Sequence, residues 1–153
     1  MASLLRVSEA AALGLHTAVY LAAHPGGRHS VGEVARELNV SENHLSKVCQ
    51  RLVHEGVLRA VRGPGGGISL ARPADQVTLL DVYEAIEGPM GTSYCLLGRE
   101  LCSSETCVMG GLVESVHRQV EEYFAHTTVA AIGSTDPLVA RDMALITGGM
   151  KRG

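Results

Sequence analysis

VGEVARELNVSENHLSKVCQRLVHEGVL, residues 31–58, is the stretch of sequence that decides the fold. Its apolar residues recur at helical spacing in two runs, with a short polar break between them. The runs are Val31, Val34, Ala35 and Leu38, and then Leu45, Val48, Cys49, Leu52 and Val53. Ser30 and Ser41 are suitable N-caps ahead of the runs, and Glu33 completes a capping box with Ser30. The pattern predicts two short helices joined by a tight turn at residues 39–41, which is a helix-turn-helix.

Two short segments rich in branched apolar residues follow, at 57–61 and 68–70, and a Gly/Pro loop separates them. Such a pair predicts a β-hairpin. A hairpin directly after the second helix makes the unit a winged helix-turn-helix, so we expect a mainly α fold with a small β-hairpin wing. Two helices and a hairpin also fit an ordinary α+β fragment, and the pattern alone does not separate the two interpretations.

Charge favours the winged helix. Residues 28–72 hold seven Arg and Lys against four Asp and Glu, a net charge of +3, whereas the remaining residues hold six against twelve, a net charge of −6. A basic segment within an acidic chain indicates a local site for a polyanion. Aromatic residues make up only 3% of the chain, which argues against stacking on single-stranded bases. Double-stranded DNA is therefore the expected partner.

The composition predicts one compact domain with an appended element, because the chain has 153 residues, 46% of them hydrophobic and 19% charged. No apolar run reaches membrane-spanning length and no signal-peptide pattern opens the chain, so we expect a cytoplasmic protein that does not bind membranes. Thiols stay reduced in that compartment, which makes the four cysteines poor disulfide candidates.

The rest of the chain predicts three further helices. Residues 4–23 form an apolar-rich first helix that His24-Pro-Gly-Gly27 ends, and a capping box at Thr78 opens a short helix. From residue 108 to Phe124 apolar residues repeat every four positions, and this stripe has no obvious partner within so small a domain. A second copy of the chain is the natural partner, so we expect a homodimer with a long C-terminal dimerisation helix.

These elements divide the chain into four segments. The periodicity fades toward the C-terminus, where we expect a mobile tail. The segments are 1–90 as a winged helix-turn-helix DNA-binding domain, 91–107 as a cysteine-containing sensor loop, 108–132 as the dimerisation helix and 133–153 as the tail.

Three cysteines lie close together in the sensor loop with spacing C-x6-C-x4-C, at Cys95, Cys102 and Cys107. Thiolates on a pliable loop bind soft metals and iron–sulfur clusters, so the spacing predicts a metal or cluster site. Three reduced, unliganded thiols are the alternative. Structural zinc and clusters usually have four ligands, so a fourth must come from elsewhere, and the spacing does not identify the metal. Cys49 lies on the apolar face of a predicted helix and is expected to be a small core residue.

The wing carries a resemblance to a known family. The run Val61-Arg-Gly-Pro-Gly-Gly-Gly67, preceded by residues 45–52 and 56–58, resembles the wing signature of the Rrf-two (Rrf2) family of bacterial transcription regulators. The cysteine loop before a long helix and the run at 127–130 are similar to the same family. The resemblance implies a homodimeric winged-helix repressor or activator, in which the long helix crosses the same helix of the partner chain. It also implies that the members of the family that act as sensors hold a cluster near the dimer interface.

Carried over residue by residue, the resemblance implies which residues contact DNA. They are Ser41, Asn43, His44 and Lys47 in the recognition helix and Arg62, with Gly65 and Gly66, in the wing. Asn43 can bond adenine bidentately and Lys47 can reach guanine or phosphate. Arg62 suits a narrow minor groove, where the negative potential is deepest, and the glycines let the wing approach the DNA backbone closely.

The resemblance also implies an iron–sulfur cluster, 2Fe-2S or 4Fe-4S, held by Cys95, Cys102 and Cys107. The chain departs from the best-known members in its cysteine intervals. Gly110 and Ala12 stand where some members have a histidine or an acidic ligand. His16 aligns with a histidine ligand of one redox-sensing branch and is the expected fourth ligand, with Glu9 the next candidate. Cluster type and signal stay open.

The sequence therefore predicts a sequence-specific DNA-binding transcription regulator that senses redox state or iron–sulfur status through a cluster. One alternative is a cluster-free winged-helix regulator gated by thiol chemistry or a partner protein. Another is a zinc-stabilised interaction module that does not bind DNA. An enzyme is not expected, because the chain shows no triad spacing or paired carboxylates, and Gly63–Gly67 lacks the Lys and Ser/Thr of a nucleotide-binding loop.

Overall fold

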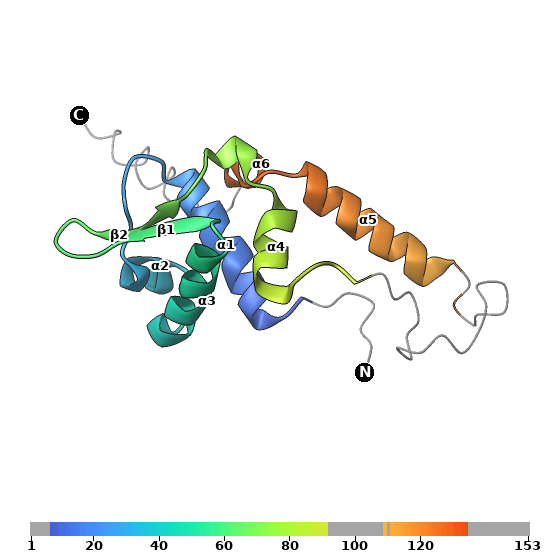
Figure 1. Cartoon of the computed structure of the whole chain (residues 1–153), viewed down its shortest axis with the longest axis horizontal. Helices are drawn as coiled ribbons and strands as arrows, with labels where there is room; N and C mark the ends of the chain where they lie inside the picture. The colour runs from blue at the N-terminus through green and yellow to red at the C-terminus, as the bar shows by residue number, and fades with distance from the viewer. Residues whose placement is uncertain (1–6, 92–108, 110, 135–153) are drawn as a thin grey trace, which may run out of the picture.

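The computed structural model describes residues 7–91, 109 and 111–134. Figure 1 shows α1 to α4 gathered into one helical body, with the β1–β2 hairpin extending from one side and α5 from the other. None of the described helices is both long enough and apolar enough to cross a membrane. The elements are α1 (Glu9–Ala23), α2 (Val31–Glu37), α3 (Glu42–His54), β1 (Leu58–Val61), β2 (Gly67–Leu70), the 3₁₀ turn η1 (Ala74–Gln76), α4 (Leu79–Glu87), α5 (Leu112–His126) and α6 (Val129–Gly133).

The core lies where α1, α3 and α4 meet. Leu45 and Leu52 of α3 and Val82 of α4 are 0% exposed. Gly14 allows α1 to approach closely, because a Cβ there would lie 3.3 Å from Ile86 and 3.7 Å from a methyl group of Leu52. The three helices therefore form one packed body, which holds α3 in a fixed orientation.

The mainly α winged helix-turn-helix predicted from the sequence is confirmed. Ser30, Ser41 and Thr78 each cap a helix with the side-chain oxygen, as their spacing predicts. At α4 the capping box is complete: the Thr78 N–H donates to Asp81 Oδ2 at 2.9 Å, and the Asp81 N–H donates to Thr78 Oγ1 at 3.1 Å. The hairpin pairs antiparallel, from Leu58 opposite Leu70 to Val61 opposite Gly67.

The first helix is shorter than the sequence predicts, because it begins at Glu9 rather than near residue 4. Ser8 is its N-cap and accepts a hydrogen bond from the Ala11 N–H at 3.1 Å. The Ser8 hydroxyl also donates to the Glu87 carboxylate, which ties the start of α1 to the end of α4. This capping serine starts the helix five residues after the predicted start.

Within the described residues 111–134, the predicted dimerisation helix is interrupted and forms two helices, α5 and α6. Thr127 is extended (φ −102°, ψ 122°), and α6 begins two residues later. The break is made by pairing with the segment before α4: the Leu79 N–H donates to the Thr127 carbonyl, and the Val129 N–H donates to the Val77 carbonyl, each at 2.9 Å. These hydrogen bonds take the chain out of the helical path, and α6 then packs against α1. Val129, which periodicity did not place in the core, is 0% exposed.

Candidate nucleic-acid interface

The turn between α2 and α3 fixes the orientation of the recognition helix, α3. Asn39 has φ 54°, the left-handed conformation that asparagine tolerates better than most residues. The Val40 N–H donates to the Ala35 carbonyl at 2.9 Å, which closes the end of α2. Ser41 then accepts from the His44 N–H at 3.5 Å and starts α3. Ser41, predicted to contact DNA, is exposed and acts at least as the cap of α3.

The two faces of α3 differ sharply in polarity. The inner face is buried, whereas the predicted DNA contacts Asn43 and Lys47 are exposed on the opposite side. Gln50, Arg51 and His54 are exposed as well and follow Lys47 by three, four and seven residues, which places them on the same face. Sequence reasoning missed these three, although their helical spacing from Lys47 could have found them. We call this set the outer face of α3: Asn43, Lys47, Gln50, Arg51 and His54.

His44 lies beside the outer face rather than on it. Its Nδ1 is 3.8 Å from Oε1 of Glu9, and its side chain is only 40% exposed. The structure thus brings together the start of α1 and the start of α3. Glu9 was singled out as a candidate metal ligand, but in this structure its carboxylate lies against His44.

The wing presents Arg62 at its tip. Arg62 is exposed and follows β1 directly, and Gly63 and Gly65 adopt left-handed conformations with φ 93° and 71°. The Gly66 N–H donates to the Gly63 carbonyl at 2.9 Å, which closes the turn. A Cβ on Gly66 would lie 2.7 Å from that carbonyl oxygen, so a side chain cannot be added there without moving backbone. The glycines therefore allow the tight turn that follows Arg62 in the wing loop.

The base of the wing is attached by an isolated β-bridge that sequence reasoning missed. His29 pairs with Ile68 through two backbone hydrogen bonds, of 3.1 and 2.8 Å. Gly67 permits this approach, because a Cβ there would lie 2.6 Å from the His29 carbonyl oxygen. The His29 ring hydrogen-bonds the Glu33 carboxylate at 3.3 Å and lowers the pKa of that carboxyl. The wing is therefore held to the start of α2 as well as to the end of α3.

Of the predicted metal ligands, His16 and the further candidate Glu9 fall within the described residues, and Cys95, Cys102 and Cys107 lie outside them. His16 is exposed on α1. No group of three or more His, Cys, Asp and Glu side chains suited to a metal occurs in the part of the chain that the structure describes. Cys49 is 2% exposed, and burial raises the pKa of its thiol to about 11, so it is the core residue that the sequence predicts.

A helix-turn-helix whose second helix has an exposed polar face, beside a wing with an exposed arginine, defines a winged-helix protein of the DNA-binding class. Residues 7–135 match the Rrf2 family, described as an iron-dependent transcriptional regulator. The chain belongs to the Rrf2 family of transcription regulators. Its relatives are regulators rather than enzymes.

Two curated relatives support this assignment. The chain is 39% identical over 83 residues to the "Putative HTH-type transcriptional regulator BadM" of Rhodopseudomonas palustris, in a match that covers 54% of this chain and 53% of that protein. The chain thus spans about half the length of BadM. The "Putative HTH-type transcriptional regulator" of Aquifex aeolicus is 30% identical over 125 residues, which cover 80% of this chain and 87% of the relative.

Solved structures show the same fold. CymR of B. subtilis, titled the global cysteine regulator, superposes with a TM-score of 0.76 at 25% identity, covering 86% of this chain and 98% of CymR. T. potens IscR superposes with a TM-score of 0.68 at 25% identity, and the match covers 97% of this chain and 94% of the IscR chain. The oxidised form of Staphylococcus aureus CymR superposes with a TM-score of 0.68 at 25% identity, and the match covers 84% of this chain and 96% of the CymR chain.

Proposed function

We propose that this protein is a dimeric regulator that binds specific sites in double-stranded DNA and adjusts that binding to a redox or iron–sulfur signal. The observation that carries the DNA-binding part is the exposed outer face of α3 next to the exposed Arg62 of the wing. Both belong to the basic segment 28–72, with its net charge of +3. A bacterial regulator of this kind acts in the cytoplasm, where the DNA is.

In this proposal each predicted residue has a distinct role at the DNA. Asn43 contacts an adenine edge in the major groove, and Lys47 contacts guanine or phosphate. Arg62 enters the minor groove, with Gly65 and Gly66 allowing the wing tip to approach the sugar–phosphate backbone. Ser41 and His44, at the start of α3, lie where recognition helices contact phosphates and base edges. Gln50 and Arg51 extend the same face toward the flanking phosphates.

The proposed dimer is formed through α5. Leu112 is 54% and Tyr123 is 55% exposed, and Val116 and Val120 continue the stripe between them. Such a stripe on a helix that extends from the body (Figure 1) suits pairing with the same helix of a second chain. Two copies of α3 would then reach half-sites about one turn of DNA apart.

The proposed sensor is an iron–sulfur cluster held by three thiolates, with His16 as fourth ligand. The donor set supports it, because thiolates with one imidazole suit soft metals and clusters. The exposure of His16 is compatible with ligation, and the family description as iron-dependent points the same way. When bound, the cluster would supply reversible one-electron chemistry. In the sequence, the sensor loop, 91–107, connects the DNA-binding domain, 1–90, to the dimerisation segment, and in this proposal a ligand change there alters the spacing of the two α3 helices.

A second candidate is a cluster-free regulator gated by thiol oxidation or by a partner protein. The likeness to CymR, which has been solved in an oxidised form, favours it over the zinc-stabilised module without DNA binding. The chain belongs to a family of transcription regulators, and this membership does not support the hypothesis of a zinc-stabilised module that does not bind DNA.

The cluster is tested by purifying the full chain without oxygen and measuring its visible spectrum, iron and acid-labile sulfide. We expect visible absorbance that Cys102→Ser abolishes and His16→Ala weakens or shifts. Cys49→Ser is the matched control, because this thiol is buried in the core and should leave iron and sulfide unchanged. Protein without iron or sulfide would refute the cluster and favour thiol gating.

DNA binding is tested separately, by fluorescence anisotropy with duplexes from the gene's own upstream region. Arg62→Ala should weaken binding about tenfold at sites with A·T-rich flanks and less at G·C-rich flanks, because the narrow groove attracts the guanidinium. Arg118→Ala, which removes an exposed arginine of α5, is the control. Failure to bind any duplex at low salt would refute the proposed function.

A further inference from the structure

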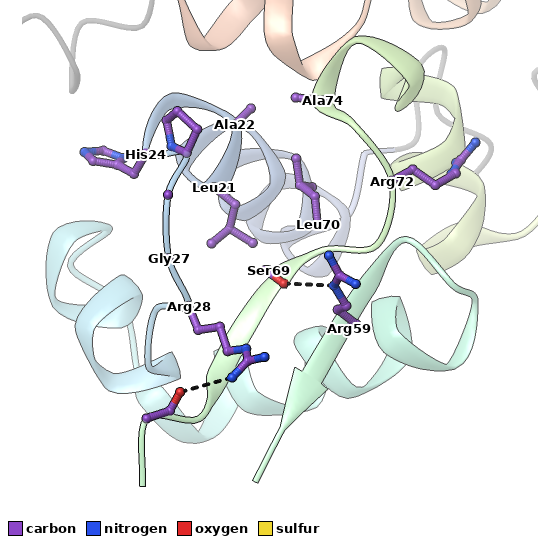
Figure 2. Close-up of a pocket in the computed structure, with 13 residues that line it drawn as sticks. Leu21, Ala22, His24, Gly27, Arg28, Arg59, Ser69, Leu70, Arg72 and Ala74 are labelled. Atoms are coloured by element: carbon purple, nitrogen blue, oxygen red, sulfur yellow. Dashed lines mark hydrogen bonds between the residues drawn. The ribbon is translucent and has the colours of Figure 1, made fainter. Parts of the chain in front are cut away.

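The wing also forms one wall of a cavity, which shares only Gly65 with the residues proposed to contact DNA. This groove has a volume of about 610 Å³ and lies between the C-terminal end of α1, the loop at residues 24–28 and the strands β1 and β2. Figure 2 shows Arg28 and Arg59 flanking Ser69, with Leu21, Leu70 and Ala74 on the side toward α1 and η1. Its volume is in the range of small-molecule sites, about 300–1,000 Å³.

The lining combines apolar and cationic side chains. Leu21, Ala22, Pro25, Leu70 and Ala74 form the apolar part, and the cationic part is Arg28, Arg59 and Arg72. None of the lining residues is an aspartate or a glutamate. Arginine forks bind carboxylates bidentately, and apolar walls bind the rest of an organic molecule. The groove therefore suits an organic anion better than an inorganic one.

The arginines differ in how far their charge is already compensated. Arg72 pairs with Asp81 at 3.1 Å. Arg59 donates from Nε to Ser69 Oγ at 3.3 Å, and Arg28 donates from Nη1 to the Gly65 carbonyl at 3.4 Å. Within residues 7–91 and 111–134, neither Arg28 nor Arg59 lies within 4 Å of a carboxylate. These two guanidinium groups are thus the ones available to a bound carboxylate.

We propose that this groove binds a small organic carboxylate with an apolar body, and that its occupancy changes DNA binding. Arg28 connects the two sites, because the carbonyl that it bonds belongs to Gly65, in the same wing loop as Arg62. A carboxylate that draws Arg28 toward Arg59 removes or redirects this bond and moves the tip relative to α3. The loop that carries Arg28 is open around Gly26 and Gly27, where an added Cβ would meet nothing within 4 Å.

Equilibrium dialysis of the full chain tests the site without DNA. The probes are 3-phenylpropionate, 4-methylpentanoate and octanoate, with 3-phenylpropionamide, acetate and inorganic phosphate as controls. We expect saturable binding of at least one apolar carboxylate at one site per chain, and about tenfold weaker binding by Arg28→Gln and by Arg59→Gln. Arg118→Gln removes an exposed arginine outside the groove and should bind as the wild type does.

Three outcomes would overturn the proposal. The first is no saturable binding of any apolar carboxylate at millimolar concentration. The second is equal binding of acetate or phosphate, which would make the groove a general anion site. The third is that Arg28→Gln and Arg59→Gln lower DNA affinity and its salt dependence without affecting any probe, which would make both arginines contacts to the DNA backbone.

Coupling to DNA is measured by repeating the anisotropy titration with the bound probe at saturation. We expect the dissociation constant for DNA to change at least threefold in the wild type and not in Arg59→Gln. An unchanged constant in the wild type would refute the regulatory part of the proposal. Dialysis reports on the groove even if the protein proves not to bind DNA.

Discussion

The two amphipathic helices α3 and α5 carry similar patterns and meet different surroundings. In α3 the apolar positions Leu45, Val48, Cys49 and Leu52 are all buried against α1, α4 and the hairpin. In α5 only Val113 is buried among the described residues, and Leu112 and Tyr123 are more than half exposed. Phe124 attaches the C-terminal part of α5 to α4 through an edge contact with Tyr83, at 5.6 Å between ring centroids.

The difference shows that periodicity identifies an apolar face but not the partner that covers it. The apolar face of α3 is buried by other elements of the same chain, so the exposed outer face of α3 is the one available to a ligand. The apolar face of α5 is largely not buried by the described part of the chain, and for this reason we infer that a second chain covers it. The predictions below test this division of roles, beginning with the largest expected effect.

Leu52→Ala should reduce the free energy of unfolding by about 2–5 kcal/mol, because it leaves a cavity where α1, α3 and α4 meet. Urea denaturation monitored by circular dichroism measures the change. Gln50→Ala, on the outer face of the same helix, should change it by less than about 0.5 kcal/mol. Similar values for the two variants would show that the faces of α3 are not divided as described.

Val120→Glu should weaken the proposed dimer about a hundredfold, which corresponds to about 2.7 kcal/mol, because a carboxylate would be buried in the apolar stripe of α5. Sedimentation equilibrium measures the dissociation constant. Gln119→Glu adds the same charge one residue away at an exposed position and should leave the constant within about twofold. A wild-type chain that is monomeric at all concentrations would show that α5 has another partner.

Asn43→Ala should reduce the preference for specific over random DNA by about 1–3 kcal/mol, because it removes a bidentate contact to a base. Competition anisotropy measures both affinities. Lys47→Ala separates its two proposed contacts: loss of a phosphate contact lowers both affinities and the salt slope alike, whereas loss of a guanine contact lowers mainly the specific affinity. Equal losses on specific and random DNA for Asn43→Ala would contradict a base-contacting role.

Local sequence signals predicted the helix-turn-helix and the hairpin well, because helix caps and the periodicity of apolar residues depend on residues that are close together in the sequence. Ser41 and Thr78 start helices as expected. Interactions between distant segments were not predictable in the same way. The pairing of His29 with Ile68, the helix break at Thr127 and the meeting of His44 with Glu9 all depend on tertiary packing. The groove likewise joins residues 21–28 with 59–74, and only the folded chain brings them together.

Cys49 allows the burial of the inner face of α3 to be measured through pH. Its thiol pKa rises from a usual value of 9.0 to about 11 in the folded protein. The unfolded chain therefore loses this proton first, so stability falls as pH rises from about 9 to about 11. Cys49→Ala should flatten that fall by on the order of 1–2 kcal/mol, measured as urea midpoints across this range.

A cysteine on the outside of α5 completes the comparison. Ser115 is exposed and lies outside the apolar stripe. Ser115→Cys in the Cys49→Ala background should therefore leave the pH profile of Cys49→Ala unchanged, since an exposed thiol ionises alike in folded and unfolded chains. If Cys49→Ala and the wild type lost stability equally between pH 9 and 11, the thiol would not be desolvated. The inner face of α3 would then open to water more readily than its packing implies.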